Sequence, residues 1–213
     1  GYSNRLVDLA IFMKGRDNAA GPCSAFIAKL VADYKVPPTR DLTSNAETQS
    51  CLDMATAIVK SGIDIGQLST YAFNVRPLPP ANVIAAIKNA QSYVALKTCP
   101  PSHLSVIFPI YHEQNRAKPK EEHPKGQDVV RNKCKQLAWL FEANPQSTWN
   151  LMACDDGCDL GSSDIMKDMA AKAGLTDKFS TVHIQEACDR QIWPAIQKPS
   201  DSRKGGAVLY GLY

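Results

Sequence analysis

The sequence predicts an α/β protein in which a partial parallel sheet with flanking helices follows a small helical region. First, the hundred N-terminal residues carry helical periodicity interrupted by turns. Second, strand-like apolar runs then alternate with amphipathic helical segments, which is typical of βαβ units. Third, one of these runs ends in Asp155-Asp156, and acids at the carboxyl edge of a parallel sheet are where α/β folds bind nucleotides.

The N-terminal region, residues 1–100, is expected to consist of helices joined by turns, with an extended connector at residues 76–80. Apolar residues at helical spacing predict helices at about residues 6–14, 24–34, 44–62 and 83–96. Val36-Pro37-Pro38 ends the second helix, because proline disfavours helical geometry in the residue before it and lacks a backbone donor. Ser44 and Glu47 have the spacing of a capping box for the third helix. We expect a domain boundary at Cys99-Pro100-Pro101.

The second domain, residues 101–213, is expected to contain three parallel strands. These are predicted at residues 104–110, 149–154 and 179–184. A helix is predicted between the first two strands, at residues 127–141, because its apolar residues share one face. A second helix is predicted from the capping segment 161–164 to Gly174. Helices between successive strands imply a parallel sheet with right-handed crossovers.

Composition argues against two classes of protein. The chain has 213 residues, 44% of them hydrophobic, and a formal net charge of +3. This charge is small and forms no dense basic stripe with interleaved aromatics, so nucleic-acid binding is not expected. No apolar run approaches the roughly 20 residues that cross a bilayer, and the N-terminus lacks the pattern of a signal peptide. We therefore expect an intracellular protein that is soluble or peripheral to a membrane.

The seven cysteines favour reduced thiols. They are odd in number and scattered, and they contain no Cys-x-x-Cys pair. Cys154 and Cys158 flank the acidic pair, but a zinc site needs further ligands, and the histidines offer no matching cluster in the sequence. No metal site is predicted, and a redox or metal protein is the weakest of the functional readings.

The pair Asp155-Asp156 is the first candidate for a binding site. At the end of a parallel strand, two carboxylates can accept hydrogen bonds from a base or a ribose, or hold a divalent cation. Gly157 then allows the chain to turn sharply. The alternative is an ordinary strand-to-helix turn in which one acid caps the following helix.

Three ordered blocks of sequence resemble the family 2 glycosyltransferases. The blocks are residues 105–113, which contain Pro-x-Tyr, residues 149–158, which contain Asp-Asp-Gly, and residues 202–212, which contain Lys-Gly-Gly. The resemblance covers about residues 103–213. It implies the nucleotide-diphospho-sugar transferase fold, of which this chain would hold the N-terminal half. It also implies transfer of a sugar from a nucleotide diphosphate donor to an acceptor hydroxyl or lipid phosphate.

The resemblance also implies a set of nucleotide-binding residues. Tyr111 would pack beside the base and Glu113 would lie near the ribose, while one of the two acids would accept from a ring nitrogen of the base. The complete set is Pro109, Tyr111, Glu113, Asp155, Asp156 and Lys204. Three of these residues have structural alternatives: Tyr111 as a core aromatic, Glu113 as a solvated acid, and Lys204 as a surface lysine.

In the family, a further strand ending in Asp-x-Asp binds the Mg²⁺ or Mn²⁺ that bridges the donor's diphosphate. That motif does not occur up to Tyr213, so the resemblance implies an enzyme that is incomplete in this chain, with its catalytic residues unknown. Alternatively, the chain is a noncatalytic structural subunit of a larger assembly. It would then contact other subunits through its N-terminal helices or an exposed sheet edge.

Overall fold

The computed structural model describes residues 21–212, except for the side chains of Arg203 and Lys204. The helix predicted at residues 6–14 lies outside this range. The described residues form two compact units, one made of residues 21–41 and 46–95 and the other of residues 42–45 and 96–212. Within the described part of the chain, no helix combines the length and apolar character needed to cross a membrane.

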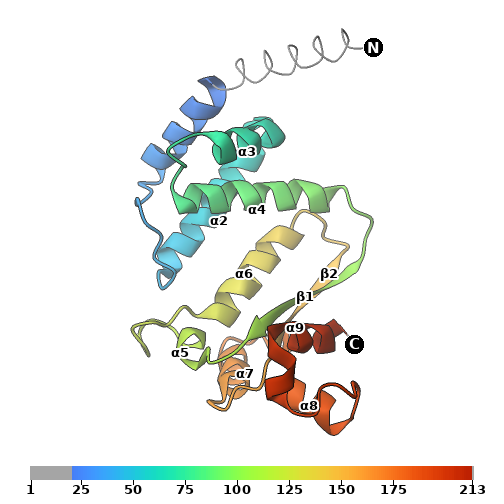
Figure 1. Ribbon diagram of the computed structural model, residues 1–213. Helices are drawn as coiled ribbons and strands as arrows, with labels where there is room; N and C mark the ends of the chain where they lie inside the picture. The colour runs from blue at the N-terminus through green and yellow to red at the C-terminus, as the bar shows by residue number, and fades with distance from the viewer. Residues whose placement is uncertain (1–20, 213) are drawn as a thin grey trace, which may run out of the picture. The chain divides into compact units, whose positions relative to one another are not determined.

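The described secondary structure of the first unit consists of helices joined by loops (Figure 1). Residues 21–33 form its first helix, followed by α2 (Asn45–Ser61), α3 (Ile65–Asn74) and α4 (Ala81–Lys97). The helices predicted at residues 24–34, 44–62 and 83–96 are confirmed. Helix α3 was not predicted. Its N-cap is Asp64, whose side chain accepts a hydrogen bond from Gln67 N at 2.9 Å. Aspartate is one of the residues preferred at this position.

The second unit is built on a parallel sheet with the strand order β1-β2-β3. Its strands are β1 (His103–Ile110), β2 (Thr148–Asp155) and β3 (Phe179–His183). The three predicted strands and their parallel pairing are confirmed. Because β1 pairs with β2 alone among the described strands, one edge of β1 carries no strand partner.

Helices cover both faces of the sheet, and alternation along β2 separates two apolar clusters. Leu151 and Ala153 pack in one cluster with α6 (Val129–Phe141) and α7 (Ser162–Lys172). Met152 and Cys154 pack in the other with α8 (Ile184–Asp189) and α9 (Pro199–Leu212). Figure 1 shows α6 and α9 against the sheet, with the short helix α5 (Gln114–Ala117) beyond the end of β1. The result is a three-layer α/β arrangement.

The block containing Lys-Gly-Gly folds as helix α9, which the sequence did not predict as a helix. Two glycines explain how closely this helix packs. A Cβ at Gly211 would collide with the Cys154 sulfur on β2, and a Cβ at Gly157 would collide with the Pro199 side chain at the start of α9. Gly157 also has φ 88°, a conformation that favours glycine. Glycine at both positions therefore allows α9 to lie directly against the end of β2.

Candidate functional site

The carboxyl ends of the three strands meet at one edge of the sheet. Ile110 at the end of β1 lies opposite Asp155 at the end of β2, and Asp155 lies opposite His183 at the end of β3. The residues that follow β1 and β2, including Tyr111 and Asp156, therefore emerge side by side. This edge is the usual binding position of α/β folds.

Asp155 is a buried residue that organises the turn after β2. Its side chain is 1% exposed, and both carboxylate oxygens are engaged. Oδ1 accepts from the backbone N–H of Cys158 at 2.8 Å, and Oδ2 accepts from the Ser163 hydroxyl at 2.5 Å. The Asp155 carboxylate thus holds the loop between β2 and α7 in place. It does not cap α7 itself, because the N-cap of α7 is Gly161 and carries no side-chain capping hydrogen bond.

His183 lies next to this carboxylate. Its Nδ1 accepts from Gln185 N at 3.0 Å, so in the neutral ring the proton is on Nε2. Nε2 lies 3.8 Å from Asp155 Oδ1, close enough for electrostatic attraction but too far for a hydrogen bond. The residue at the end of β3 thus lies beside the buried Asp155 carboxylate, to which it contributes an electrostatic contact.

Asp156 is the half-buried acid of the pair, and it joins three segments of the chain. Its backbone N–H donates to Ile110 O at 3.0 Å, which fixes it to the end of β1. Its Oδ1 accepts from the Ser202 hydroxyl at 3.3 Å, which fixes it to α9. The structure therefore separates the two predicted acids, with Asp155 inside the fold and Asp156 at the sheet edge.

Tyr111 lies on the surface beside this edge. It is 45% exposed, and its ring stacks on that of His112 at 4.0 Å between centroids with an interplanar angle of 19°. A partly exposed ring that rests on a second ring is held in a defined orientation. Such a ring offers an aromatic surface on which a planar ligand can stack.

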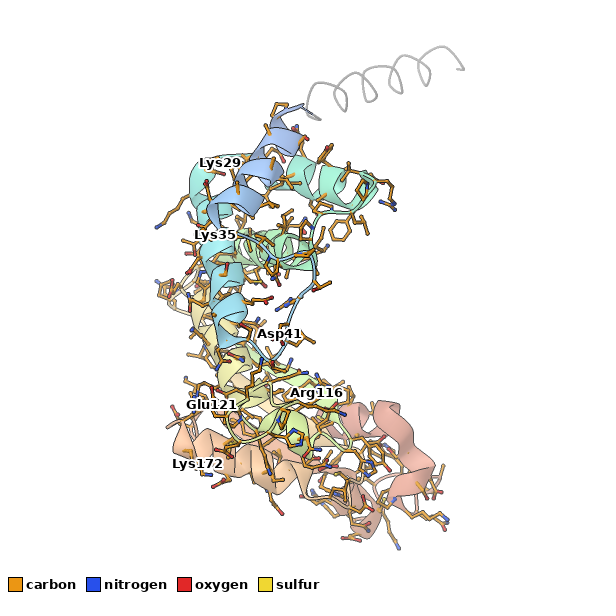
Figure 2. The ribbon with its side chains drawn as sticks, turned by 90° about the vertical axis from the view of Figure 1, so that its left-hand side faces the viewer. Lys29, Lys35, Asp41, Arg116, Glu121 and Lys172 are labelled. Atoms are coloured by element: carbon orange, nitrogen blue, oxygen red, sulfur yellow. The ribbon has the colours of Figure 1, made fainter. Side chains whose placement is uncertain are left out.

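Pro109 and Glu113 line a cavity of about 220 Å³ on the α6 side of the sheet. Glu113 accepts from Arg116 Nη1 at 2.8 Å, and Arg116 projects from α5 (Figure 2). Lys133 of α6 also lines the cavity, with Nζ 4.8 Å from the centre of the Phe108 ring. Burial, and secondly the charge of Arg116, lowers the pKa of Lys133. The cavity thus combines an apolar wall with one acid and two basic side chains.

The last predicted residue, Lys204, lies within α9, but its side chain is outside the described part of the chain. Five residues of the predicted set are therefore placed by the structure. Tyr111 and Asp156 lie at the sheet edge, Asp155 lies beneath it, and Pro109 and Glu113 line the adjoining cavity.

One group of residues at this edge did not emerge from sequence spacing. His112, Cys158 and Asp159 bring three potential metal-ligating atoms within 4.8 Å of one another. Their separation along the chain hides this proximity. The parallel pairing of β1 and β2 could have indicated that these residues lie close together, since residues that follow neighbouring parallel strands share one edge of the sheet.

Comparisons with protein-family models, curated proteins and solved structures found no match to this chain. The function must therefore be inferred from the residues at the carboxyl edge. These present an exposed aromatic ring at Tyr111, an acid at Asp156, and Ser202 of helix α9. All three belong to the blocks that carry the sequence resemblance.

Proposed function

We propose that the α/β unit binds a nucleotide diphosphate sugar at the carboxyl edge of its sheet, as the donor-binding part of a glycosyltransferase. The observation that carries the proposal is the position of Asp156. Its backbone is hydrogen bonded to Ile110 at 3.0 Å, and its side chain to Ser202 at 3.3 Å. The three blocks that resemble family 2 glycosyltransferases thus meet at one residue, although Ile110 and Ser202 each lie 46 residues from Asp156 along the chain.

In this proposal, different side chains contact different parts of the nucleotide. Tyr111 stacks on the base, because its ring is held against His112 and remains 45% exposed. Asp156 accepts a hydrogen bond from a ring N–H of the base, and Glu113 lies toward the ribose. Asp155 does not contact the ligand in this proposal, because its two oxygens already accept hydrogen bonds within the fold.

Lys204 attracts the diphosphate in this proposal. Lys204 comes from the block that lies near the nucleotide in the family, and α9 begins beside Asp156 through the Ser202 contact. A lysine is suited to the role given to Lys204, because its ammonium group attracts phosphate as a point charge.

Pro109 forms part of the wall behind the base, since it lines the cavity next to Ile110.

Catalysis is not assigned to residues of this chain. In the family, Mg²⁺ or Mn²⁺ bound by Asp-x-Asp stabilises the nucleotide diphosphate as it leaves the anomeric carbon. The sequence contains no Asp-x-Asp, and Asp155 is committed to the turn after β2, so these residues do not fit that metal site. The proposal is therefore limited to donor binding.

The unpaired edge of β1 favours a second candidate, a noncatalytic subunit of a larger assembly. β1 is eight residues long and pairs with β2 alone among the described strands. Its other edge offers backbone donors and acceptors to a strand of another protein. A folded chain that binds no nucleotide, and that purifies from its source at constant stoichiometry with other subunits, would favour this candidate.

Calorimetric titration tests the donor-binding proposal. The folded chain is titrated with the diphosphates of uridine, guanosine, cytidine, adenosine and thymidine, each with and without Mn²⁺. Saturable binding of at least one is expected. Replacing Asp156 by Asn should weaken that binding about tenfold or more, because one carboxylate oxygen becomes an NH2 donor and the negative charge that strengthens the bond to a base N–H is lost. Asp164→Asn is the matched control, because Asp164 is an exposed acid on α7. No heat with any diphosphate would rule out donor binding.

A further inference from the structure

Three side chains with metal-ligating atoms meet at the carboxyl edge of the sheet. His112 follows β1, while Cys158 and Asp159 follow β2. His112 Nε2 lies 2.7 Å from Asp159 Oδ1, and all three ligating atoms lie within 4.8 Å of one another. Ligands of a tetrahedral zinc ion lie about 3 to 4 Å apart, so small side-chain rotations would bring these atoms into coordination.

The sulfur of Cys158 has polar groups around it. The side chain is buried, and the backbone N–H of Leu160 donates to the sulfur at 3.3 Å. The Ser162 hydroxyl lies 3.0 Å from the sulfur and also accepts from Glu113 N at 2.9 Å. A hydroxyl can accept that bond and still donate its own proton, so Ser162 can donate to the sulfur when Cys158 is a thiolate. Donors of this kind orient a ligating thiolate and stabilise its charge.

His112 and Asp159 form the open side of the cluster. Their side chains are 41% and 78% exposed, in contrast to the buried Cys158. The short contact between imidazole and carboxylate requires a proton between the two atoms, and a metal cation can replace that proton. With three protein ligands and access to solvent, a bound ion would keep a fourth position for water.

The orientation of His112 is unusual. Its φ is 54°, in the left-handed region, where histidine is uncommon but more frequent than most other residues. In this conformation its ring stacks on Tyr111 while Nε2 reaches the loop after β2. The backbone thus holds the imidazole against the Asp159 carboxylate.

We propose that His112, Cys158 and Asp159 bind a divalent transition-metal ion, with Zn²⁺ as the preferred ion. One nitrogen, one sulfur and one oxygen ligand suit Zn²⁺, whereas Mg²⁺ and Ca²⁺ prefer oxygen ligands alone. This site differs from the Asp-x-Asp metal site of the glycosyltransferases in its ligands. The proposal of a metal site does not depend on nucleotide binding, so metal binding is measured in the absence of nucleotide.

Cobalt spectroscopy tests the proposal directly. Co²⁺ is titrated into the reduced, metal-free chain, and Zn²⁺ is then added as a competitor. The wild type should develop a thiolate-to-cobalt charge-transfer band and strong visible bands of a four-coordinate site, and Zn²⁺ should abolish both. Cys158→Ser should remove the charge-transfer band. Cys99→Ser, which alters an exposed thiol, should leave it unchanged.

Two further variants cover the case in which Cys158→Ser fails to fold. His112→Asn suits the left-handed conformation, and Asp159→Asn alters an exposed side chain, so circular dichroism should remain that of the wild type. Each should weaken Zn²⁺ binding by about tenfold or more, while Asp164→Asn should not. A folded wild type without a charge-transfer band would overturn the proposal. So would a band that persists at full strength in His112→Asn and Asp159→Asn.

Discussion

The backbone N–H of Asp156 donates to the carbonyl oxygen of Ile110 at 3.0 Å, so the acid after β2 is attached to the end of β1. The neighbouring acid has a different role. Asp155 is enclosed by the loop that it stabilises, and its oxygens accept from Cys158 and Ser163. The two adjacent carboxylates thus differ in burial, Asp155 being buried and Asp156 half-buried, and their substitutions should have different effects.

Asp155→Asn should lower the free energy of unfolding by about 2–4 kcal/mol, because an amide cannot accept with both terminal atoms and places a donor against buried donors. Urea denaturation measures this change. The control Asp164→Asn should lie within about 0.5 kcal/mol of the wild type, since Asp164 is exposed on α7. Equal stability of Asp155→Asn and wild type would contradict the role assigned to this buried carboxylate.

Two glycines of α9 should respond to alanine in opposite directions. At Gly211 a Cβ would collide with the Cys154 sulfur, whereas at Gly205 no described atom beyond the chain neighbours and the helix's own backbone lies within 4 Å of it. Gly211→Ala should therefore destabilise by about 1–3 kcal/mol through overpacking. Gly205→Ala should stabilise by about 0.5–1 kcal/mol, because alanine favours the helix. Thermal unfolding of both variants measures the contrast, and a stabilising Gly211→Ala would show that α9 does not pack on β2 as described.

Cys134 should resist alkylation while Cys99 reacts. Burial, and secondly the charge of Asp177, raises the pKa of Cys134 to about 11, and Cys99 is exposed. Only the thiolate reacts with iodoacetamide, so at pH 8 Cys134 should be labelled far more slowly than Cys99. Mass spectrometry of digested peptides measures both rates. Comparable rates in the folded protein would contradict the burial of Cys134.

The same pKa gives a stability prediction at high pH. The folded state retains the Cys134 proton between the ordinary pKa of 9.0 and the raised value of about 11, whereas the unfolded state loses it. Stability from this group is therefore present below pH 9 and declines as pH rises toward 11. The decline should be shallower in Cys134→Ala. Urea denaturation at several pH values in that window compares the slopes, and identical slopes would contradict the prediction.

Much of the sheet could be predicted from the sequence, because local patterns specify it. Apolar runs identified β1, β2 and β3, and helical connections implied their parallel order. Helix α9 was missed because two interior glycines lower its helix propensity, and its packing against β2 depends on contacts distant in sequence. Tertiary packing there outweighs local preference.

The candidate site was predictable only in part. Adjacency of Asp155 and Asp156 gave no distinction between them, although strand alternation puts Asp155 on the face of Leu151 and Ala153, which is buried. The approach of His112 to Cys158 depends on register and on the left-handed backbone of His112, and neither is encoded in a local motif. Contacts between the loops that follow neighbouring strands can therefore be identified only once the fold is known.

Hydrogen exchange with and without a nucleoside diphosphate tests the central claim most directly, since it reports both binding and location. At saturating ligand, amide protection should increase at residues 109–113, 155–158 and 199–206, where the three blocks meet around Asp156. Helices α2 and α3 should exchange at unchanged rates. Unchanged exchange in those three segments, or protection confined to other segments, would contradict a nucleotide site at this edge.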